Sequence, residues 1–221
     1  MPASAPEADL FAEADAGPER IALAPGAVLL RGFARDEAPA LIEAAWRVAA
    51  IAPFRHMVTP GGFTMSAAMT NCGTAGWVSD RRGYRYDGTD PETGLAWPAM
   101  PDLFRDLAAR AAAEAGYEGF EPDACLINRY TPGTRLTLHQ DKNERDVAAP
   151  IVSVSLGLPA TFLFGGAKRT DRAQRLRLVH GDVAVWGGAS RLAFHGIAPL
   201  AEGEHALTSN CRINLTLRKA L

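Results

Sequence analysis

The sequence predicts an α+β fold in which a jelly-roll core of short strands is preceded by two helices that cover one of its faces. Two observations favour this fold. After residue 123 the chain divides into eight short segments rich in β-forming residues and separated by Gly and Pro turns, as is typical of a double-sheet jelly roll. Before that point, two segments have helical periodicity. At 221 residues, the chain is long enough for one domain with a proper core.

The N-terminal region is predicted from its composition. Residues 1–20 hold five acidic residues and one arginine among many Ala and Pro residues, so we expect an acidic disordered tail. A single domain is expected over 21–221. Its first element, Ile21–Phe33, is predicted to be extended and to be broken at Pro25–Gly26.

Two helices are expected next. The segments Asp36–Ala52 and Asp102–Ala115 have apolar residues at helical spacing, and each is predicted to be N-capped by the aspartate that begins it. Gly116 is expected to end the second helix. Residues 53–100 between the helices are rich in turns, so we expect short extended segments there, which form a strand-rich lid.

The jelly-roll core is expected over roughly 120–221. Its predicted strands are Cys125–Tyr130, Arg135–His139, Ile151–Leu158, Thr161–Phe164, Leu176–Val179, Val183–Trp186, Leu192–His195 and Cys211–Arg218.

Bulk properties narrow the class of protein. The apolar share of 48% and charged share of 22% are those of a globular chain, and no apolar run approaches the ~18 residues of a membrane span. Three cysteines without paired spacing predict reduced thiols in a cytoplasmic protein. The net charge is −2, yet residues 124–221 hold thirteen basic and seven acidic residues, so this half is expected to meet an anion.

A candidate metal site lies in this half of the chain. His139 and Asp141 are two residues apart in a predicted strand end, and His195 ends another predicted strand. Two imidazoles and one carboxylate match the facial triad of non-haem Fe(II) oxygenases, which leaves coordination positions open for a 2-oxo acid and dioxygen. The spacing alone is weak, and an ordinary polar strand residue is the alternative for His139.

A second His-x-Asp pair is expected to have no metal role. His180 and Asp182 flank Gly181 between two alternating strands, so we place them at a hairpin tip that faces solvent. His56 and His205 have no partner at ligand spacing.

A candidate anion site lies on the last predicted strand. There Arg212, Asn214 and Arg218 share one face, while apolar residues occupy the other. Arginines inside a barrel need anions, because an unpaired buried charge is costly, and a dicarboxylate would supply them. Asn128 and Tyr130 end a strand close to the metal candidates and can bond the same acid. A solvent-facing edge strand is the alternative.

The lid region carries an aromatic and basic cluster. Trp77 is followed by Tyr84, Arg85 and Tyr86. Flat aromatic faces can stack on nucleobases, and arginines beside them can meet phosphates. A surface hairpin with cross-strand aromatic packing is the alternative.

Taken together, these residues resemble the AlkB-type Fe(II)/2-oxoglutarate dioxygenases, and most closely the bacterial members of that family. The resemblance covers nearly the whole chain from about residue 21. The matching stretches are PFRHMVTPGGFTMSAAMTNCG (53–73), WPAMP (97–101), PDACLINRY (122–130), LHQDK (138–142), PIVSVSLGLPA (150–160), FGGAKR (164–169), HGDVAVWGGASRL (180–192) and CRINLTLR (211–218).

The resemblance implies a double-stranded β-helix with a nucleotide-recognition lid, and a DNA-repair activity. The family removes methyl groups from bases such as N1-methyladenine and N3-methylcytosine in single- or double-stranded DNA, and in some members RNA. It uses Fe(II), O2 and 2-oxoglutarate and releases succinate, CO2 and formaldehyde. We expect a monomer with no membrane partner.

The resemblance also implies roles for individual residues. The iron ligands would be His139, Asp141 and His195; the 2-oxoglutarate contacts would be Asn128, Tyr130, Arg212, Asn214 and Arg218; and the substrate contacts would be Trp77, Tyr84, Arg85, Tyr86, Asn143 and Arg169. Asn143 departs from the pattern, because the similar bacterial members carry Asp there. That carboxylate would face the exocyclic amine of the damaged base, so the departure bears on base preference.

Two other functions use part of the same pattern. One is an Fe(II)/2-oxoglutarate hydroxylase of a small molecule or protein, which needs the triad but no stacking lid. The other is a nucleic-acid-binding module with a metal-stabilised jelly roll, which would consume no 2-oxoglutarate.

Overall fold

The computed structural model describes residues 19–221, so nearly all of the predicted acidic tail lies outside the described residues. Strand β1 begins at Arg20, within the segment assigned to the tail, and pairs with β2 after a turn at the expected Pro25–Gly26 break. No helix in the described part of the chain is long and apolar enough to cross a membrane.

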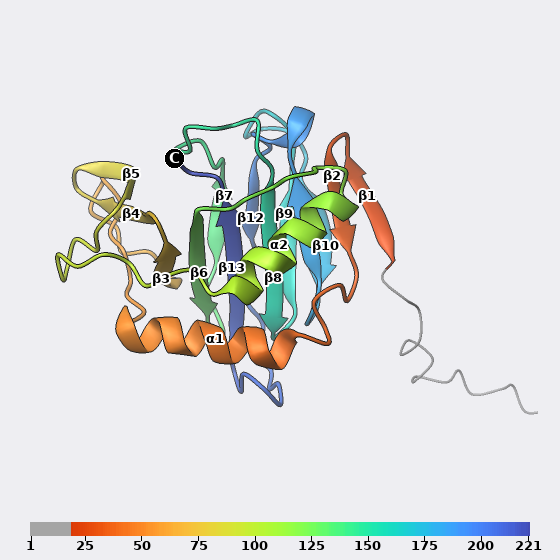
Figure 1. Cartoon of the computed structure of the whole chain (residues 1–221). Coiled ribbons are helices and arrows are strands. Elements are labelled where there is room, and N and C mark those ends of the chain that lie inside the picture. The colour runs from red at the N-terminus through yellow and green to blue at the C-terminus, as the bar shows by residue number, and fades with distance from the viewer. Residues whose placement is uncertain (1–18) are drawn as a thin grey trace, which may run out of the picture.

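A large antiparallel sheet forms one layer of the fold (Figure 1). Its spatial order is β1-β2-β11-β8-β13-β6-β3. The strands are β1 (Arg20–Ala24), β2 (Ala27–Leu30), β3 (Ala68–Gly73), β6 (Ala124–Tyr130), β8 (Ile151–Gly157), β11 (Val183–Trp186) and β13 (Arg212–Arg218). Strand β13 is central, with β8 on one side and β6 on the other, which excludes the edge-strand alternative.

A smaller sheet has the order β10-β9-β12-β7. Its strands are β7 (Leu136–His139), β9 (Ala160–Phe164), β10 (Gln174–Leu178) and β12 (His195–Ile197). From β6 onward the chain crosses repeatedly between the two sheets, which confirms the predicted jelly-roll core. The prediction for the seventh strand was wrong at its start: residues 192–194 form a turn after the 3-10 helix η2 (Gly188–Ser190), and β12 begins only at His195.

Both helices pack on the outer face of the large sheet, as predicted (Figure 1). They are α1 (Ala38–Ile51) and α2 (Asp102–Glu114). Leu41 of α1 and Phe104 of α2 are fully buried in one cluster with Ile213 and Leu215 of β13. The apolar face of β13 therefore packs against the helices, and its polar face lines the space between the two sheets.

The predicted helix caps were wrong. The N-cap positions are Glu37 and Pro101, and neither makes a side-chain capping bond. A proline in the first turn of α1 removes one N–H that would need a cap, and Asp102 lies inside the first turn of α2, where its charge favours the helix dipole. Gly116 does end the second helix, in a left-handed conformation with φ of 91°.

The region between the helices forms a separate two-stranded hairpin, made of β4 (Gly76–Asp80) and β5 (Gly83–Asp87). It projects from the β3 side of the large sheet (Figure 1). The short extended segments expected over 53–100 are thus β3, β4 and β5.

Candidate metal centre and binding cavity

A cavity of about 790 Å³ lies between the two sheets. Its wall contains polar residues of β6 and β13 from the large sheet, residues of β7 and β12 from the small sheet, and two aromatic side chains of the β4–β5 hairpin. Most of the residues singled out in the sequence line this one cavity.

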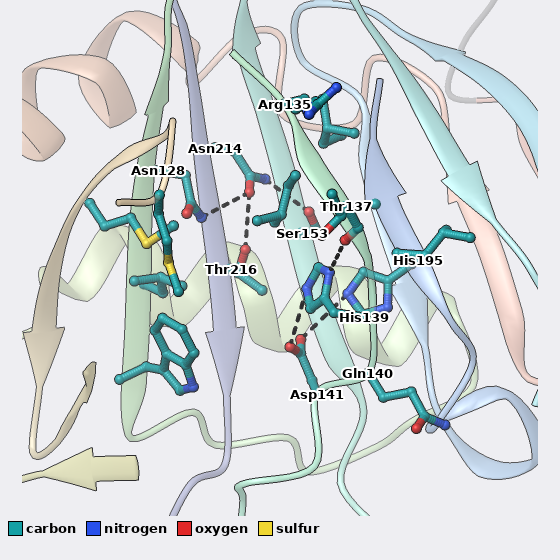
Figure 2. Close-up of a pocket in the computed structure, with 18 of the residues that line it drawn as sticks. Asn128, Arg135, Thr137, His139, Gln140, Asp141, Ser153, His195, Asn214 and Thr216 are labelled. Atoms are coloured by element: carbon teal, nitrogen blue, oxygen red, sulfur yellow. Dashed lines mark hydrogen bonds and ion pairs between the residues drawn. The ribbon is translucent and has the colours of Figure 1, made fainter. Parts of the chain in front are cut away.

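The three metal-ligand candidates meet at one point of the wall. His139 is the last residue of β7 and His195 is the first of β12, and the two are register partners. Nε2 of His139 lies 3.7 Å from Oδ1 of Asp141, and Nε2 of His195 lies 3.7 Å from Oδ2. Figure 2 shows both imidazoles turned toward this carboxylate. All three ligand atoms lie within 4.8 Å of one another.

Backbone carbonyls set the orientation of both imidazoles. Nδ1 of His139 donates to the carbonyl of Thr137 at 2.9 Å, and Nδ1 of His195 donates to that of Ala193 at 3.0 Å. Each Nε2 lone pair is therefore available to a metal. Burial, and then the neighbouring His139, lowers the pKa of His195 to about 4, which keeps it neutral as a ligand must be.

The carboxylate of Asp141 is held ionised. Burial opposes its ionisation, but the Arg218 guanidinium holds the pKa of Asp141 well below its usual range. Arg218 donates from Nε at 3.0 Å and from Nη2 at 2.7 Å, both to Oδ2. Oδ1 is left facing His139. Two imidazoles and one anionic oxygen in this arrangement fit Fe(II).

The guanidinium of Arg212 in the cavity wall is only partly paired. Arg212 is 1% exposed, and Nη2 donates to Oγ of Ser155 at 3.0 Å, but Nε and Nη1 have no partner among the described residues. Its guanidinium lies 5.0 Å from the ring centroid of Tyr130, and burial lowers its pKa. Oδ1 of Asn128 is also unpaired. Buried charge without an anion is costly, so this end of the cavity fits a carboxylate of 2-oxoglutarate.

The five residues expected to contact 2-oxoglutarate all line the cavity, but they differ in what already occupies them. Asn214 donates to Oγ of Ser153 and to the Val154 carbonyl, and accepts from Asn128 and Thr216 (Figure 2). Arg218 is engaged by Asp141 rather than left open. Among the five, Arg212 thus has free donors and Asn128 has a free acceptor.

The aromatic pair of the hairpin reaches the same cavity. Trp77 and Tyr84 are stacked, with ring centroids 5.7 Å apart and an interplanar angle of 14°. Nε1 of Trp77 donates to Oδ1 of Asn143 at 3.4 Å, so Asn143 lies beside the stack. Arg169 also lines the cavity; it donates to the Leu138 carbonyl at 2.6 Å.

Two of the expected substrate contacts are placed elsewhere. Arg85 is the register partner of Val78, on the face of the hairpin opposite to Trp77, and it is paired with Asp80 and Asp87. The structure does not bring it to the cavity, because strand alternation turns it away. Tyr86 is on the Trp77 face but does not line the cavity; its hydroxyl donates to Glu144.

Sequence reasoning missed one part of the site. Glu144 is 7% exposed and pairs with Arg191 through Nη2 at 3.2 Å, and it accepts from the hydroxyl of Tyr86 at 2.6 Å. Arg191 also donates from Nη1 to the Asp141 carbonyl at 2.8 Å. In the sequence, Glu144 belongs to a run of charged residues that is typical of a solvated loop, so no local signal marks it as buried.

The second His-x-Asp pair is separate from the triad, as expected, but its predicted exposure was wrong. Asp182 is fully buried, pairs with Arg31 at 2.6 Å and accepts from the backbone N–H of Gly32 and of Val179. Gly181 takes the left-handed conformation of a tight turn, with φ of 87°. The turn is packed against the start of the domain rather than open to solvent.

Comparisons with known proteins agree with this geometry. Residues 26–218 match the family model of the 2OG-Fe(II) oxygenase superfamily. The chain is 61% identical over 212 residues to the alpha-ketoglutarate-dependent dioxygenase AlkB of Escherichia coli strain K12, covering 96% of this chain and 97% of that protein. It is 34% identical over 161 residues to the DNA N(6)-methyladenine demethylase ALKBH1C of Arabidopsis thaliana, covering 61% of this chain and 35% of that protein. The solved structure of OsALKBH1 superposes with a TM-score of 0.81 at 30% identity, covering 91% of this chain and 100% of that one.

Proposed function

The chain belongs to the 2OG-Fe(II) oxygenase superfamily, and from this premise we propose that it repairs alkylated nucleic acids by oxidative demethylation. It is an Fe(II)- and 2-oxoglutarate-dependent dioxygenase. Its proposed substrates are bases such as N1-methyladenine and N3-methylcytosine in DNA, and RNA carrying the same lesions. The products are the repaired base, formaldehyde, succinate and CO2.

One observation carries the choice of substrate: the stacked pair of Trp77 and Tyr84 lines the same cavity as His139, Asp141 and His195. A base that enters the cavity meets flat aromatic surface on the way to the metal. Stacking on such side chains contributes roughly 1–3 kcal/mol per base. A methylated base that no longer pairs is also easier to extrude from a helix. A cavity for a small aliphatic substrate has no need of this stack.

Different residues of the cavity would bind the metal and 2-oxoglutarate. His139, Asp141 and His195 would hold Fe(II), which when bound supplies the oxidising chemistry with dioxygen and 2-oxoglutarate. Arg212 would bind a carboxylate of 2-oxoglutarate through its unpaired Nε and Nη1. Asn128, Tyr130 and Asn214 would complete that subsite.

The substrate contacts lie nearer the hairpin. Trp77 and Tyr84 would stack on the base, Asn143 would face its polar edge, and the cationic Arg169 would meet a phosphate. We leave Arg85 out of this set because it is paired on the far face of the hairpin. Tyr86 would support the hairpin through Glu144 rather than touch the base.

We propose a single catalytic domain over 21–221 that acts as a monomer on single- and double-stranded DNA. Its three cysteines are all free, which suits a reducing compartment such as the cytoplasm.

The experiment that tests the function is reconstitution with Fe(II) without oxygen, followed by air, 2-oxoglutarate and an oligonucleotide that carries one N1-methyladenine. We expect succinate and formaldehyde in equal amounts and loss of the methyl group, with the unmethylated oligonucleotide and His139→Ala as controls. Succinate formation that the methylated strand does not stimulate would favour a small-molecule or protein hydroxylase. Strand binding with no 2-oxoglutarate consumption would favour a non-enzymatic binding module.

A further inference from the structure

We propose that Glu144 is a positioning residue that couples the β4–β5 hairpin to the metal ligand Asp141. The proposal rests on the proposed function in one respect: the hairpin is taken as the surface on which the substrate base stacks. It assigns a role to Glu144, a buried carboxylate that neither holds the metal nor lines the cavity.

Glu144 belongs to a buried ion cluster with Asp141, Arg191 and Arg218. Within this cluster, Glu144 and Arg218 link the hairpin to the ligand Asp141. The hydroxyl of Tyr86 donates to Oε1 of Glu144 at 2.6 Å. The same Oε1 lies 3.5 Å from Nε of Arg218, which itself donates to Oδ2 of Asp141 at 3.0 Å. Oε2 of Glu144 is held by Arg191 at 3.2 Å. The chain of contacts from hairpin to ligand is therefore Tyr86, Glu144, Arg218 and Asp141.

The cluster is sensitive to the loss of any donor. Its two arginines and two carboxylates balance one another, and their side chains are at most 10% exposed. Nε of Arg218 faces two acceptors, Asp141 and Glu144, at 3.0 and 3.5 Å. When the hairpin is docked, the Tyr86 hydroxyl satisfies Glu144. When it is undocked, Glu144 competes with Asp141 for this guanidinium, because buried anions need partners.

The hydrogen bond from Trp77 to Asn143 is a second link between this face of the hairpin and the segment after Asp141. Trp77 is the register partner of Tyr86, so the two side chains share one face of the hairpin. Trp77 donates to Asn143 while Tyr86 donates to Glu144. Two neighbouring side chains of the hairpin thus donate hydrogen bonds to two consecutive residues, Asn143 and Glu144, which follow closely after Asp141. A base that stacks on Trp77 and fixes the hairpin also fixes the segment that carries the ligand.

Coupling of this kind must be reciprocal. If a bound base strengthens metal binding by some factor, then bound metal strengthens base binding by the same factor. We expect Tyr86→Phe and Glu144→Gln to reduce that factor, because each removes one link and leaves the cavity wall unchanged. Tyr117→Phe and Asp182→Asn are the matched controls: Tyr117 donates to the Gly26 carbonyl at 2.8 Å, and Asp182 is a buried carboxylate whose partners are Arg31, Gly32 and Val179.

The first experiment measures the affinity of a trinucleotide with a central N1-methyladenine, with and without Co(II) and 2-oxoglutarate, in the absence of oxygen. We expect tightening of about fivefold or more in the unaltered protein and in both controls, and of less than about twofold in Tyr86→Phe and Glu144→Gln. The same tightening in all five proteins would overturn the proposal. If Glu144→Gln fails to fold, Tyr86→Phe still decides, since it leaves Glu144 with both arginines.

The second experiment needs no nucleic acid and so separates the coupling from the proposed substrate. Hydrogen exchange of residues 76–87 is measured before and after loading with Co(II) and 2-oxoglutarate. We expect loading to slow exchange of the hairpin in the unaltered protein and the controls, and not in Tyr86→Phe or Glu144→Gln. If no trinucleotide binds but loading still protects the hairpin, the proposed substrate is wrong and the coupling stands. If loading protects the hairpin in the variants as it does in the unaltered protein, the coupling is wrong whatever binds.

Discussion

His139 and His195 are register partners on the antiparallel strands β7 and β12, although they come from distant parts of the sequence. Their ring centroids are 4.3 Å apart, and each Nε2 lies 3.7 Å from a different oxygen of Asp141. The strand pairing therefore fixes the spacing of the two imidazoles independently of a bound metal. Such a site should depend on each of its three ligands.

We expect His139→Ala, Asp141→Ala and His195→Ala each to abolish metal-dependent turnover and to weaken Co(II) binding by more than about 100-fold, which exceeds the usual loss from a supporting residue. Anaerobic titration with Co(II) measures this. His180→Ala is the control, since His180 is not part of the cluster. Retention of metal by His139→Ala and its loss from His180→Ala would show that the ligand assignment is wrong.

The unpaired nitrogens of Arg212 lead to a prediction about 2-oxoglutarate. Arg212→Ala should raise the half-saturating concentration of 2-oxoglutarate with little change in Co(II) affinity, because Arg212 contacts no metal ligand. Truncating a charged partner of a buried carboxylate costs roughly 2–5 kcal/mol. Arg218→Ala should also weaken Co(II) binding, because it releases Asp141. Equal half-saturation in Arg212→Ala and the unaltered enzyme would exclude the carboxylate contact.

The parts of the site that follow from a local pattern were predictable from sequence. The strict alternation of β13 predicted that Arg212, Asn214 and Arg218 share a face, and the structure confirms it because strand geometry has a fixed period of two. The same period of two places Arg85 on the opposite face of the hairpin from Tyr84 and Tyr86, so the three cannot all contact one substrate.

What the sequence did not predict depends on contacts between distant segments. The burial of Glu144 needs Arg191, Arg218 and Tyr86 to converge from three elements, and no spacing in the chain encodes that meeting. Asp182 is similar: the turn that holds it is local, but its partner Arg31 follows β2, a strand that is adjacent to β11 in the sheet and distant from it in the sequence. The predicted helix caps failed for a different reason: α1 begins at Ala38 with Glu37 as N-cap, and α2 begins at Asp102 itself, so neither predicted aspartate stands at the N-cap position.

The stacked pair on the hairpin should matter for substrate and not for the metal centre. We expect Trp77→Ala and Tyr84→Ala to weaken binding of a methylated single strand by about 1–3 kcal/mol each, while decarboxylation of 2-oxoglutarate without substrate is retained. Fluorescence anisotropy and succinate release measure the two effects. Equal loss of both activities would show instead that these aromatics stabilise the fold.

His180 gives the fold a pH-dependent contribution outside the metal site. Burial, then His205 and Arg35, lowers the pKa of His180 in the folded state. The unfolded chain therefore binds more protons below about pH 6.5, and the free energy of unfolding falls as the pH drops through that region. The loss should be small, because His180 is half-buried and solvent screens it.

The test is urea unfolding of the metal-free protein at two pH values, about 7.5 and 5.5. His180→Asn is the comparison, because its amide oxygen can replace Nδ1 as the acceptor of the Gly157 N–H, at 3.0 Å in the structure, without titrating. We expect the variant to lose less stability than the unaltered protein. A larger loss in the variant would contradict the lowered pKa.

Asn143 bears on which lesions are preferred. It lines the cavity beside Trp77 and accepts from the indole Nε1 at 3.4 Å. An amide offers both an acceptor and a donor, so it can accept from the exocyclic amine of methylated adenine or cytosine or donate to a carbonyl of methylated guanine or thymine. It has no negative charge to favour a cationic base. We therefore expect less bias toward cationic lesions than in a relative with Asp at this position.

Asn143→Asp should restore that bias. A hydrogen bond to a charged group is worth about 1 kcal/mol more than a neutral one, so the ratio of repair rates for N1-methyladenine over N1-methylguanine should rise several-fold. Competition between the two lesions in oligonucleotides of the same sequence measures the ratio directly. Asn143→Ala, which adds no charge, should not raise it. A ratio that stays flat or falls in Asn143→Asp would contradict this prediction. The added carboxylate would then lie beside the stacked pair without favouring the cationic base, so another part of the cavity would have to recognise the charge of the lesion.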